Sequence, residues 1–156
     1  MKFSAQEEYG LRCLMAIGRS ADSCTIAEIA RSEGLTEPYA AKLLSVLRKE
    51  GLLTSTRGQS GGYTLARPPE KIEVAPVLEA LGGRLYEAGF CDRFSGQETS
   101  CTHNDDCSLR PLWNSVQAAI DRVLNGVTLA DLIVQGEPDA PIQLMAEPPR
   151  RAGGFR

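Results

Sequence analysis

Residues 25–67 read TIAEIARSEGLTEPYAAKLLSVLRKEGLLTSTRGQSGGYTLAR, and the pattern of this stretch decides the fold. Its first part pairs Thr25 with Glu28 at the spacing of a capping box, in which a hydroxyl and a carboxylate each serve a backbone amide of the first helical turn. This pair predicts the start of a short helix that ends near Gly34, because glycine is favoured just past a helix C-terminus.

A second helix follows directly. Thr36 stands in the N-cap position, and Pro38 fits the first turn because the amide that proline lacks has no partner there. Apolar residues then recur at helical spacing until Gly51, where we expect the helix to stop. The residues on this apolar face are Tyr39, Leu43, Leu44 and Leu47.

The rest of the stretch is typical of a β-hairpin. Residues 52–56 and 62–66 favour strands, and the segment 57–61 between them contains glycines that supply the positive φ angles of a turn. Upstream, apolar residues at helical spacing predict another helix over residues 4–18. Helix, helix, turn, helix and hairpin is the order of a winged helix–turn–helix, so the fold class predicted for residues 1–68 is mainly α with a small β-hairpin wing.

Charge separates this stretch from the rest of the chain. The 156 residues carry a net charge of −3, which argues against bulk attraction to nucleic acid. Residues 36–67, however, hold five basic side chains (Lys42, Arg48, Lys49, Arg57, Arg67) against two acidic ones (Glu37, Glu50). Such a stretch can be a solvated face with no partner, but its coincidence with the second helix and the wing favours double-stranded DNA.

The expected DNA contacts follow from the usual geometry of the motif, in which its second helix enters the major groove. Thr36 and Tyr39 stand near the start of this helix, where side chains meet base edges, although Tyr39 is alternatively a core aromatic. Basic side chains farther along suit phosphates, which position the protein without reading sequence. The candidate DNA-binding residues are Thr36, Pro38, Tyr39, Lys42, Arg48, Arg57, Gly58, Gln59 and Ser60.

Beyond the hairpin, residues 69–133 are expected to form a short helix over 74–81, a polar loop over 89–106 and a long helix from about Ser108 to Leu124. The apolar stripe of the long helix is wider than a small winged domain covers, so we assign this C-terminal helix, with the first helix, to a homodimer interface. The alternative is that it packs within its own subunit. Residues 134–156 are rich in Gly, Pro, Arg and Glu, which predicts disorder.

Targeting signals are not evident in the sequence. No apolar run reaches the length of about 18 residues that a transmembrane helix needs, and the N-terminus becomes acidic where a signal peptide is apolar. We therefore expect a cytoplasmic protein with no membrane partner. In that reducing compartment, clustered cysteines indicate metal or redox chemistry rather than structural disulfides.

The five cysteines fall into two groups. Cys13 is on an apolar helical face and is expected in the core, and Cys24 has no companion. Cys91, Cys101 and Cys107 are spaced C-x9-C-x5-C in the polar loop, and Cys107 is expected at the start of the long helix, where the helix dipole favours a thiolate. Three thiolates suit zinc or an iron–sulfur cluster, and the wide spacing favours a cluster; free thiols or a redox disulfide remain the alternative.

Three segments resemble one known family. They are YGLR at residues 9–12, RGQSGGY at residues 57–63, and the cysteine segment from Cys101 through CSLRPLW at residues 107–113. Together they resemble the IscR/NsrR-type winged-helix repressors, which are dimeric bacterial regulators that carry an iron–sulfur cluster. The resemblance covers residues 1 to about 133 and implies that the three loop cysteines are cluster ligands.

The resemblance also bears on a fourth ligand. In one branch of the family this ligand is a His three residues after the last cysteine, a position that Arg110 occupies here and that excludes such ligation. In another branch it is a carboxylate from the first helix of the partner subunit, and Glu8 falls at that position; Glu7 differs in helical phase. His103, inside the loop, is an alternative ligand. The carboxylate branch favours [4Fe–4S] over [2Fe–2S].

These patterns predict a homodimeric transcriptional regulator, a repressor, that senses redox state, nitric oxide or iron–sulfur status. In the implied switch, loss of the cluster frees Glu8 and shifts the first helix. The alternative regulator uses zinc or a thiol redox switch without a cluster. An enzyme is disfavoured because the chain lacks a C-x-x-C pair and a second set of catalytic polar groups, so no small-molecule substrate is expected.

Overall fold

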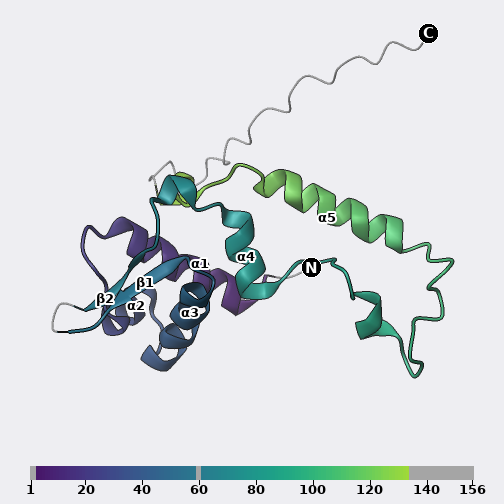
Figure 1. Ribbon diagram of the computed structural model, residues 1–156, viewed down its shortest axis with the longest axis horizontal. Coiled ribbons are helices and arrows are strands. Elements are labelled where there is room, and N and C mark those ends of the chain that lie inside the picture. The colour runs from purple at the N-terminus through teal and green to yellow at the C-terminus, as the bar shows by residue number, and fades with distance from the viewer. Residues whose placement is uncertain (1–2, 59–60, 134–156) are drawn as a thin grey trace, which may run out of the picture.

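The computed structural model describes residues 3–58 and 61–133, and the expected disorder of residues 134–156 lies outside this range. Figure 1 shows a compact body from which one long helix projects. In chain order the elements are α1 (Ala5–Arg19), α2 (Ile26–Glu33), α3 (Glu37–Lys49), β1 (Leu53–Thr56), β2 (Gly62–Leu65), a 3-10 turn (Pro69–Lys71), α4 (Val74–Gly82), a second 3-10 turn (Cys91–Phe94), α5 (Arg110–Leu124) and α6 (Leu129–Ile133).

Local sequence signals account for the starts of α1 and α2. Ser4 and Glu7 form a capping box on α1, and Thr25 and Glu28 form the predicted one on α2. In the second box the Thr25 amide donates to the Glu28 carboxylate over 2.8 Å. Gly34 ends α2 in the left-handed conformation, with a φ of 67°, as its position predicted.

Helix α3 differs from its prediction in one detail. Thr36 occupies the N-cap position as expected, but its side chain makes no capping hydrogen bond. Pro38 stands in the first turn, and the helix ends at Lys49, just before Gly51 turns the chain with a φ of 68°. The start of α3 therefore rests on the fixed backbone of Pro38 rather than on the Thr36 hydroxyl.

The wing is a two-stranded antiparallel sheet in which Leu53 pairs with Leu65 and Thr56 with Gly62. Its base is tied to the segment between α1 and α2 by a pair of backbone hydrogen bonds, because Cys24 and Tyr63 each donate to the carbonyl of the other. A Cβ on Gly62 would lie 2.7 Å from the Cys24 carbonyl oxygen, so only glycine permits this approach. The winged helix–turn–helix fold class is thereby confirmed.

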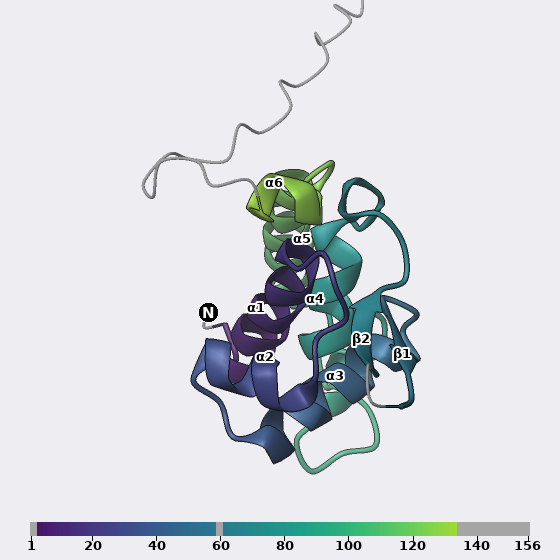
Figure 2. The same ribbon diagram turned by 90° about the vertical axis from the view of Figure 1, so that its left-hand side faces the viewer.

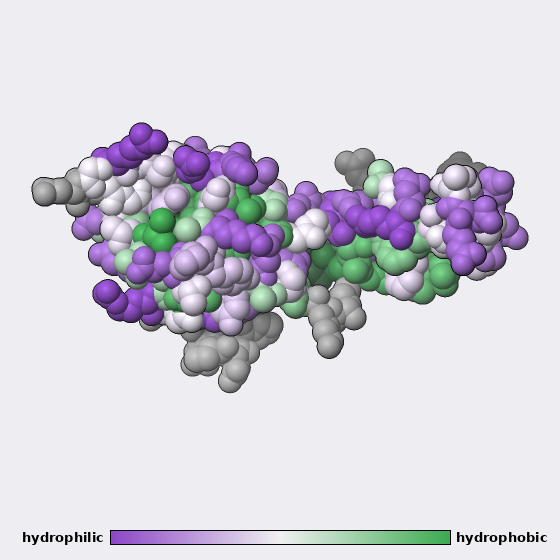
Figure 3. All heavy atoms as spheres, turned by 90° about the horizontal axis from the view of Figure 1, so that it is seen from below, coloured by the Kyte–Doolittle hydropathy of each residue, from purple (hydrophilic) through white to green (hydrophobic). Residues whose placement is uncertain are grey.

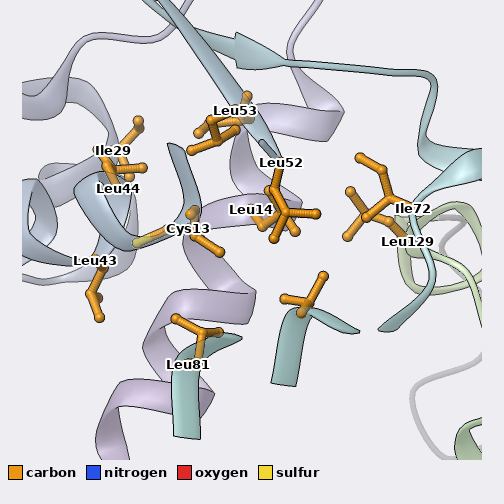
Figure 4. Close-up of a cluster of buried hydrophobic side chains, with 13 residues drawn as sticks. Cys13, Leu14, Ile29, Leu43, Leu44, Leu52, Leu53, Ile72, Leu81 and Leu129 are labelled. Carbon is orange, nitrogen blue, oxygen red and sulfur yellow. The ribbon is translucent and has the colours of Figure 1, made fainter. Parts of the chain in front are cut away.

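The core is one cluster of buried apolar side chains around α1 (Figure 4). It joins Leu14 of α1, Ile29 of α2 and Leu44 of α3 to residues that arrive from the C-terminal half, such as Leu129 of α6. Cys13 belongs to this cluster and is fully buried, which confirms that it is a core residue. Burial raises the pKa of the Cys13 thiol to about 11, so the thiol stays protonated.

The segments that precede and follow α5 in the sequence both pack on this body. The Leu129 amide donates to the Ile72 carbonyl over 2.8 Å, and the Val74 amide donates to the Val127 carbonyl over 2.9 Å. These bonds hold α6 beside the start of α4, as Figure 2 shows, while α5 leads away from the body. No helix in the described part of the chain is long and apolar enough to cross a membrane.

Helix α5 and the loop before it form an arm, which we define as residues 83–124. Gln117 is the one buried residue of α5; its carbonyl accepts from the Tyr86 amide over 3.0 Å, and its amide donates to Asp121 over 2.8 Å. Arg84 pairs with both Asp121 and Glu79 of α4. This polar junction, rather than an apolar core, sets where α5 projects.

One expectation about the arm needs correction. Helix α5 begins at Arg110, with Leu109 as its N-cap, so Cys107 precedes the helix by two residues instead of starting it. The polar loop before α5 contains a 3-10 turn, Cys91–Phe94.

Candidate functional site

The face expected to bind DNA is open to solvent. Thr36, Pro38, Lys42 and Arg48 of α3 and its N-cap are all exposed, and so are Arg57 and Gly58 at the tip of the wing. Gln59 and Ser60 lie outside the described residues. The first turn of α3 and the wing thus present their polar side chains without covering from the rest of the chain.

Tyr39 has a second set of contacts. Its ring is half-buried, packs against the core cluster and meets the Tyr9 ring edge-on, with centroids 6.2 Å apart. Edge-to-face aromatic pairs stabilise beyond the area they bury. Tyr39 therefore fastens the start of α3 to α1, which places α1 in direct contact with the helix expected to read DNA.

The YGLR segment of α1 is a junction that the sequence alone did not explain. Arg12 donates from Nε to the Glu33 carboxylate over 2.8 Å and lies over the Tyr9 ring, 5.2 Å from its centroid. The Glu33 hydrogen bond raises the pKa of Arg12. A Cβ on Gly10 would lie 2.4 Å from Leu81 of α4. The segment thus contacts α2, α3 and α4 together.

A cavity of about 370 Å³ opens in the arm, between the cysteine loop and the start of α5. Cys91, Cys101 and Cys107 all line it, and each is half-buried. The lining also includes the aromatic Tyr86, Phe90, Phe94 and Trp113, the apolar Leu109, and the polar or charged His103, Asp106, Ser108 and Arg110. The three sequence-predicted cysteines, 17 positions from first to last, therefore share one hollow.

The cysteines share the cavity without forming a tight set. Among residues 3–58 and 61–133, no three His, Cys, Asp or Glu side chains are placed so as to hold one metal ion. The donor set nevertheless fits an iron–sulfur cluster by its chemistry, because thiolates are the ligands that such clusters prefer and their irons are separate attachment points. A fourth thiol is missing from the lining, so a fourth ligand has to come from another type of residue.

Aromatic rings form one wall of the cavity. Tyr86 contacts Phe90, and Phe90 contacts Phe94, in tilted pairs with centroids 5.0 Å and 4.8 Å apart. Arg110, also in the lining, donates from Nη2 to the Asn104 carbonyl over 2.7 Å and so holds the loop between Cys101 and Cys107 against α5. The hollow has aromatic side chains, three thiols and charges of both signs, from Arg110 and Asp106, and its thiols suit a sulfur-rich occupant.

The two candidate carboxylates of α1 differ in their surroundings. Glu7 completes the capping box of Ser4, whose amide donates to it over 2.7 Å, and its side chain lies against Gly82. Glu8 is exposed, and within the described residues its carboxylate forms no hydrogen bond or ion pair, although its charge helps to raise the pKa of Arg12. Glu8 does not line the cavity of its own chain.

An exposed recognition helix joined to a wing, with a separate projecting helix, defines a DNA-binding protein of the winged helix–turn–helix class. Comparison with known proteins agrees with this class. A family model described as "Rrf2: Iron-dependent Transcriptional regulator" matches residues 3–135, and the chain therefore belongs to the Rrf2 family. Members are transcriptional regulators, which confirms the expectation that the chain is not an enzyme.

Three similar proteins illustrate the range of the family. Protein rrf2 of Nitratidesulfovibrio vulgaris is 37% identical over 135 residues, 85% of this chain and 87% of the relative. The solved structure of T. potens IscR has a TM-score of 0.67 at 32% identity, covering 85% of this chain and 86% of that one. The structure of CymR, the global cysteine regulator of B. subtilis, has a TM-score of 0.66 at 29% identity, covering 85% of this chain and 96% of that one.

Proposed function

We propose that this chain is a homodimeric, cytoplasmic repressor that senses redox state, nitric oxide or iron–sulfur status through an iron–sulfur cluster. The observation that carries the proposal is that Cys91, Cys101 and Cys107 line one cavity outside the DNA-binding body. Residues 1–68 would bind DNA, and residues 69–133 would bind the cluster and pair the two subunits.

The three cysteines and Glu8 of the partner subunit would hold the cluster, with His103 as the second candidate for the fourth ligand. When bound, the cluster would supply a redox-active centre that is sensitive to oxidation. Carboxylate is a harder and weaker ligand for iron than thiolate, so this fourth position would be the first to open. We favour [4Fe–4S] over [2Fe–2S].

A carboxylate from the other subunit requires a dimer, and the arm supports one. Leu109, Leu112 and Val123 are at least half exposed. Figure 3 shows hydrophobic side chains gathered along one side of the arm. An apolar face of this kind is stabilised when it is buried against a second copy of itself, as in an interface with two-fold symmetry.

Helix α1 would carry the signal to DNA. Glu8 stands one position before Tyr9, whose ring meets Tyr39 at the start of α3. A change in what Glu8 binds would therefore act on the helix that enters the major groove. Because two copies of α3 bind two half-sites, a small shift in their separation would change the affinity for the operator.

The first experiment is anaerobic purification with iron and sulfide analysis, visible spectra and DNA-shift assays before and after oxidation. A cluster-bound protein whose operator binding changes on oxidation supports the proposal. Glu8→Ala should then hold the cluster less well and lose the response to oxidant. Glu7→Gln is the matched control, because it keeps the capping function. A Glu8→Ala dimer that responds as the wild type does would falsify the role of Glu8.

The wing is tested separately. Arg57→Ala should weaken binding to all DNA sequences alike and reduce the slope of log affinity against log salt by about one. Arg93→Ala is a control with an equally cationic residue on the arm, paired there with Glu87. An unchanged salt slope in Arg57→Ala would remove Arg57 from the phosphate contacts.

The second candidate function is a regulator that uses zinc or a thiol redox switch without a cluster. One observation favours its thiol form: the likeness to CymR, the global cysteine regulator of B. subtilis. A colourless protein without iron or sulfide, whose DNA binding still depends on oxidation of its cysteines or on zinc, would support this function instead.

A further inference from the structure

Phe3 is the most exposed large hydrophobic side chain among the described residues, with 80% of its surface in solvent. It directly precedes Ser4, the N-cap of α1. Among residues 3–58 and 61–133 little of this ring is covered, and Phe3 is not a residue of the core cluster or of the cavity lining. Such an aromatic side chain at the start of a helix needs a partner if its apolar surface is to leave water.

The position of Phe3 associates it with Glu8. A residue directly before the N-cap and the fourth residue of the helix are neighbours in space, which is why apolar pairs at these positions form a hydrophobic staple. With Ser4 as N-cap, these two positions are Phe3 and Glu8. Because Glu8 is charged, the staple is not made, and the start of α1 presents an aromatic ring and a carboxylate side by side.

The cavity in the arm offers a matching surface. Phe94, the outermost ring of its aromatic wall, is 64% exposed, and Leu109 on its lining is 57% exposed. The same lining contains the acidic Asp106 and the basic Arg110, and the Arg110 guanidinium is the group of opposite charge to Glu8. An apolar rim next to a guanidinium complements an aromatic ring next to a carboxylate, in both hydrophobicity and charge.

We propose that Phe3 of one subunit packs on the rim formed by Phe94 and Leu109 of a second copy of the chain, so that each cavity is closed by the other subunit's α1. The inference rests on the dimer of the proposed function, with Glu8 directed to the partner's cavity. Phe3 then fixes the start of α1 against the partner's cavity. It excludes water from the cysteines and holds Glu8 in place, without being a ligand.

The first test uses the full chain, free of metal, with the variants Phe3→Ala and Phe3→Leu. Loss of an aromatic anchor should raise the Kd of the dimer in analytical ultracentrifugation about ten-fold or more, and leucine should restore most of the affinity. Trp113 is the one tryptophan of the chain and lines the cavity, so its emission should shift to longer wavelength in Phe3→Ala. A wild-type Kd and emission spectrum in Phe3→Ala would overturn the proposal.

A matched control separates closure of the cavity from dimerisation in general. Val123→Ala removes an exposed apolar group at the far end of α5 from the cavity. It should weaken the dimer, yet at protein concentrations that keep it dimeric it should leave Trp113 emission unchanged. If both variants, held dimeric, shift the emission equally, Phe3 does not cover the cavity and the inference is wrong.

Placement is tested directly with a photoreactive benzoylphenylalanine at position 3. In dimers mixed from isotopically light and heavy chains, crosslinks should join different chains and fall on the peptides that contain Phe94 or Leu109. Crosslinks within one chain, or to the wing, would contradict the inference. The metal-free readouts also separate the two proposals. If the protein shows these crosslinks but never binds iron, the cluster proposal is wrong and the docking of Phe3 stands. If cluster binding depends on Glu8 but the crosslinks are absent, only the docking of Phe3 is wrong.

Discussion

The body and the arm of this molecule are stabilised in different ways. In the body, residues from five helices (α1, α2, α3, α4 and α6) and the wing form a single apolar cluster. In the arm, the 15 residues of α5 bury only Gln117, and the three cysteines are half-buried around an open cavity. The difference teaches that the body is stabilised by apolar contacts within the subunit, whereas the arm is attached by a polar junction and leaves most of α5 in solvent.

The largest effect should come from removing core volume. Leu14 is fully buried, so Leu14→Ala should lower the free energy of unfolding by about 2–5 kcal/mol, measured by chemical denaturation. Leu112→Ala on the arm removes the same atoms from an exposed position and should change the unfolding of the body by less than about 0.5 kcal/mol while weakening the dimer. Equal losses in the two variants would erase the distinction between body and arm.

Thiol reactivity should divide the cysteines along the same line. The pKa of Cys13 is raised to about 11 by burial, from an ordinary value near 9, so at neutral pH its thiolate fraction is about a hundred-fold lower than normal. Iodoacetamide should therefore modify Cys91, Cys101 and Cys107 of the native, metal-free protein and spare Cys13 until denaturant is added. Mass spectrometry of the tryptic peptides, with fragmentation to separate Cys101 from Cys107 on their shared peptide, gives the four rates. A Cys13 as reactive as the others would mean that the body opens readily.

The junction between the regions should show an intermediate effect. Gln117→Ala leaves the Tyr86 amide without its acceptor and should cost about 1–2 kcal/mol locally. Native-state hydrogen exchange at the Tyr86 amide should accelerate about ten-fold, while exchange in the core helices stays unchanged. Asn114→Ala, an exposed position on the same helix, is the control and should alter neither rate.

The smallest effects belong to the helix caps. Thr25→Ala should destabilise the protein by about 1 kcal/mol. Hydrogen bonds from the Thr25 amide and hydroxyl lower the pKa of Glu28. Its carboxylate therefore stabilises the folded state fully at pH values above the ordinary glutamate pKa of about 4.3. This contribution disappears as the pH falls through the lower pKa that Glu28 has in the folded protein. The difference in Tm between wild type and Glu28→Gln should therefore be present at pH 7 and vanish in acid. A difference that persists in acid would assign the effect to packing.

The sequence predicted the body more completely than the arm, for a physical reason. Capping boxes, a first-turn proline and helical periodicity are local signals, and Thr25, Glu28, Pro38 and Gly51 stand where they predicted. The Thr36 hydroxyl, by contrast, was expected to cap α3 and does not. An N-cap residue type indicates where a helix begins, but the hydrogen bond depends on a side-chain rotamer that sequence does not specify.

The arm depends on contacts between distant residues, and these left little local signal. Gln117 reads as one more polar residue of an amphipathic helix, and only the placement of Tyr86 against it shows that it is buried. Arg84 likewise acquires its role because α4 and α5 bring Glu79 and Asp121 to it. The cysteine spacing predicted a common site; the three cysteines line one cavity, and their role as ligands stays a prediction. The aromatic side chains beside them and the hydrogen bond from Arg110 to the loop follow from geometry alone.

The attachment of the arm also bears on how such a protein can evolve. Between Cys91 and Cys101 the chain crosses no element of the body, and doubling the length of such a loop costs only about 0.6 kcal/mol of closure entropy. Insertions and deletions there would leave the packing of α1 and α3 intact. One DNA-reading body can thus be retained while its cysteine loop diverges, so that a lineage can acquire a new stimulus without having to find a new operator.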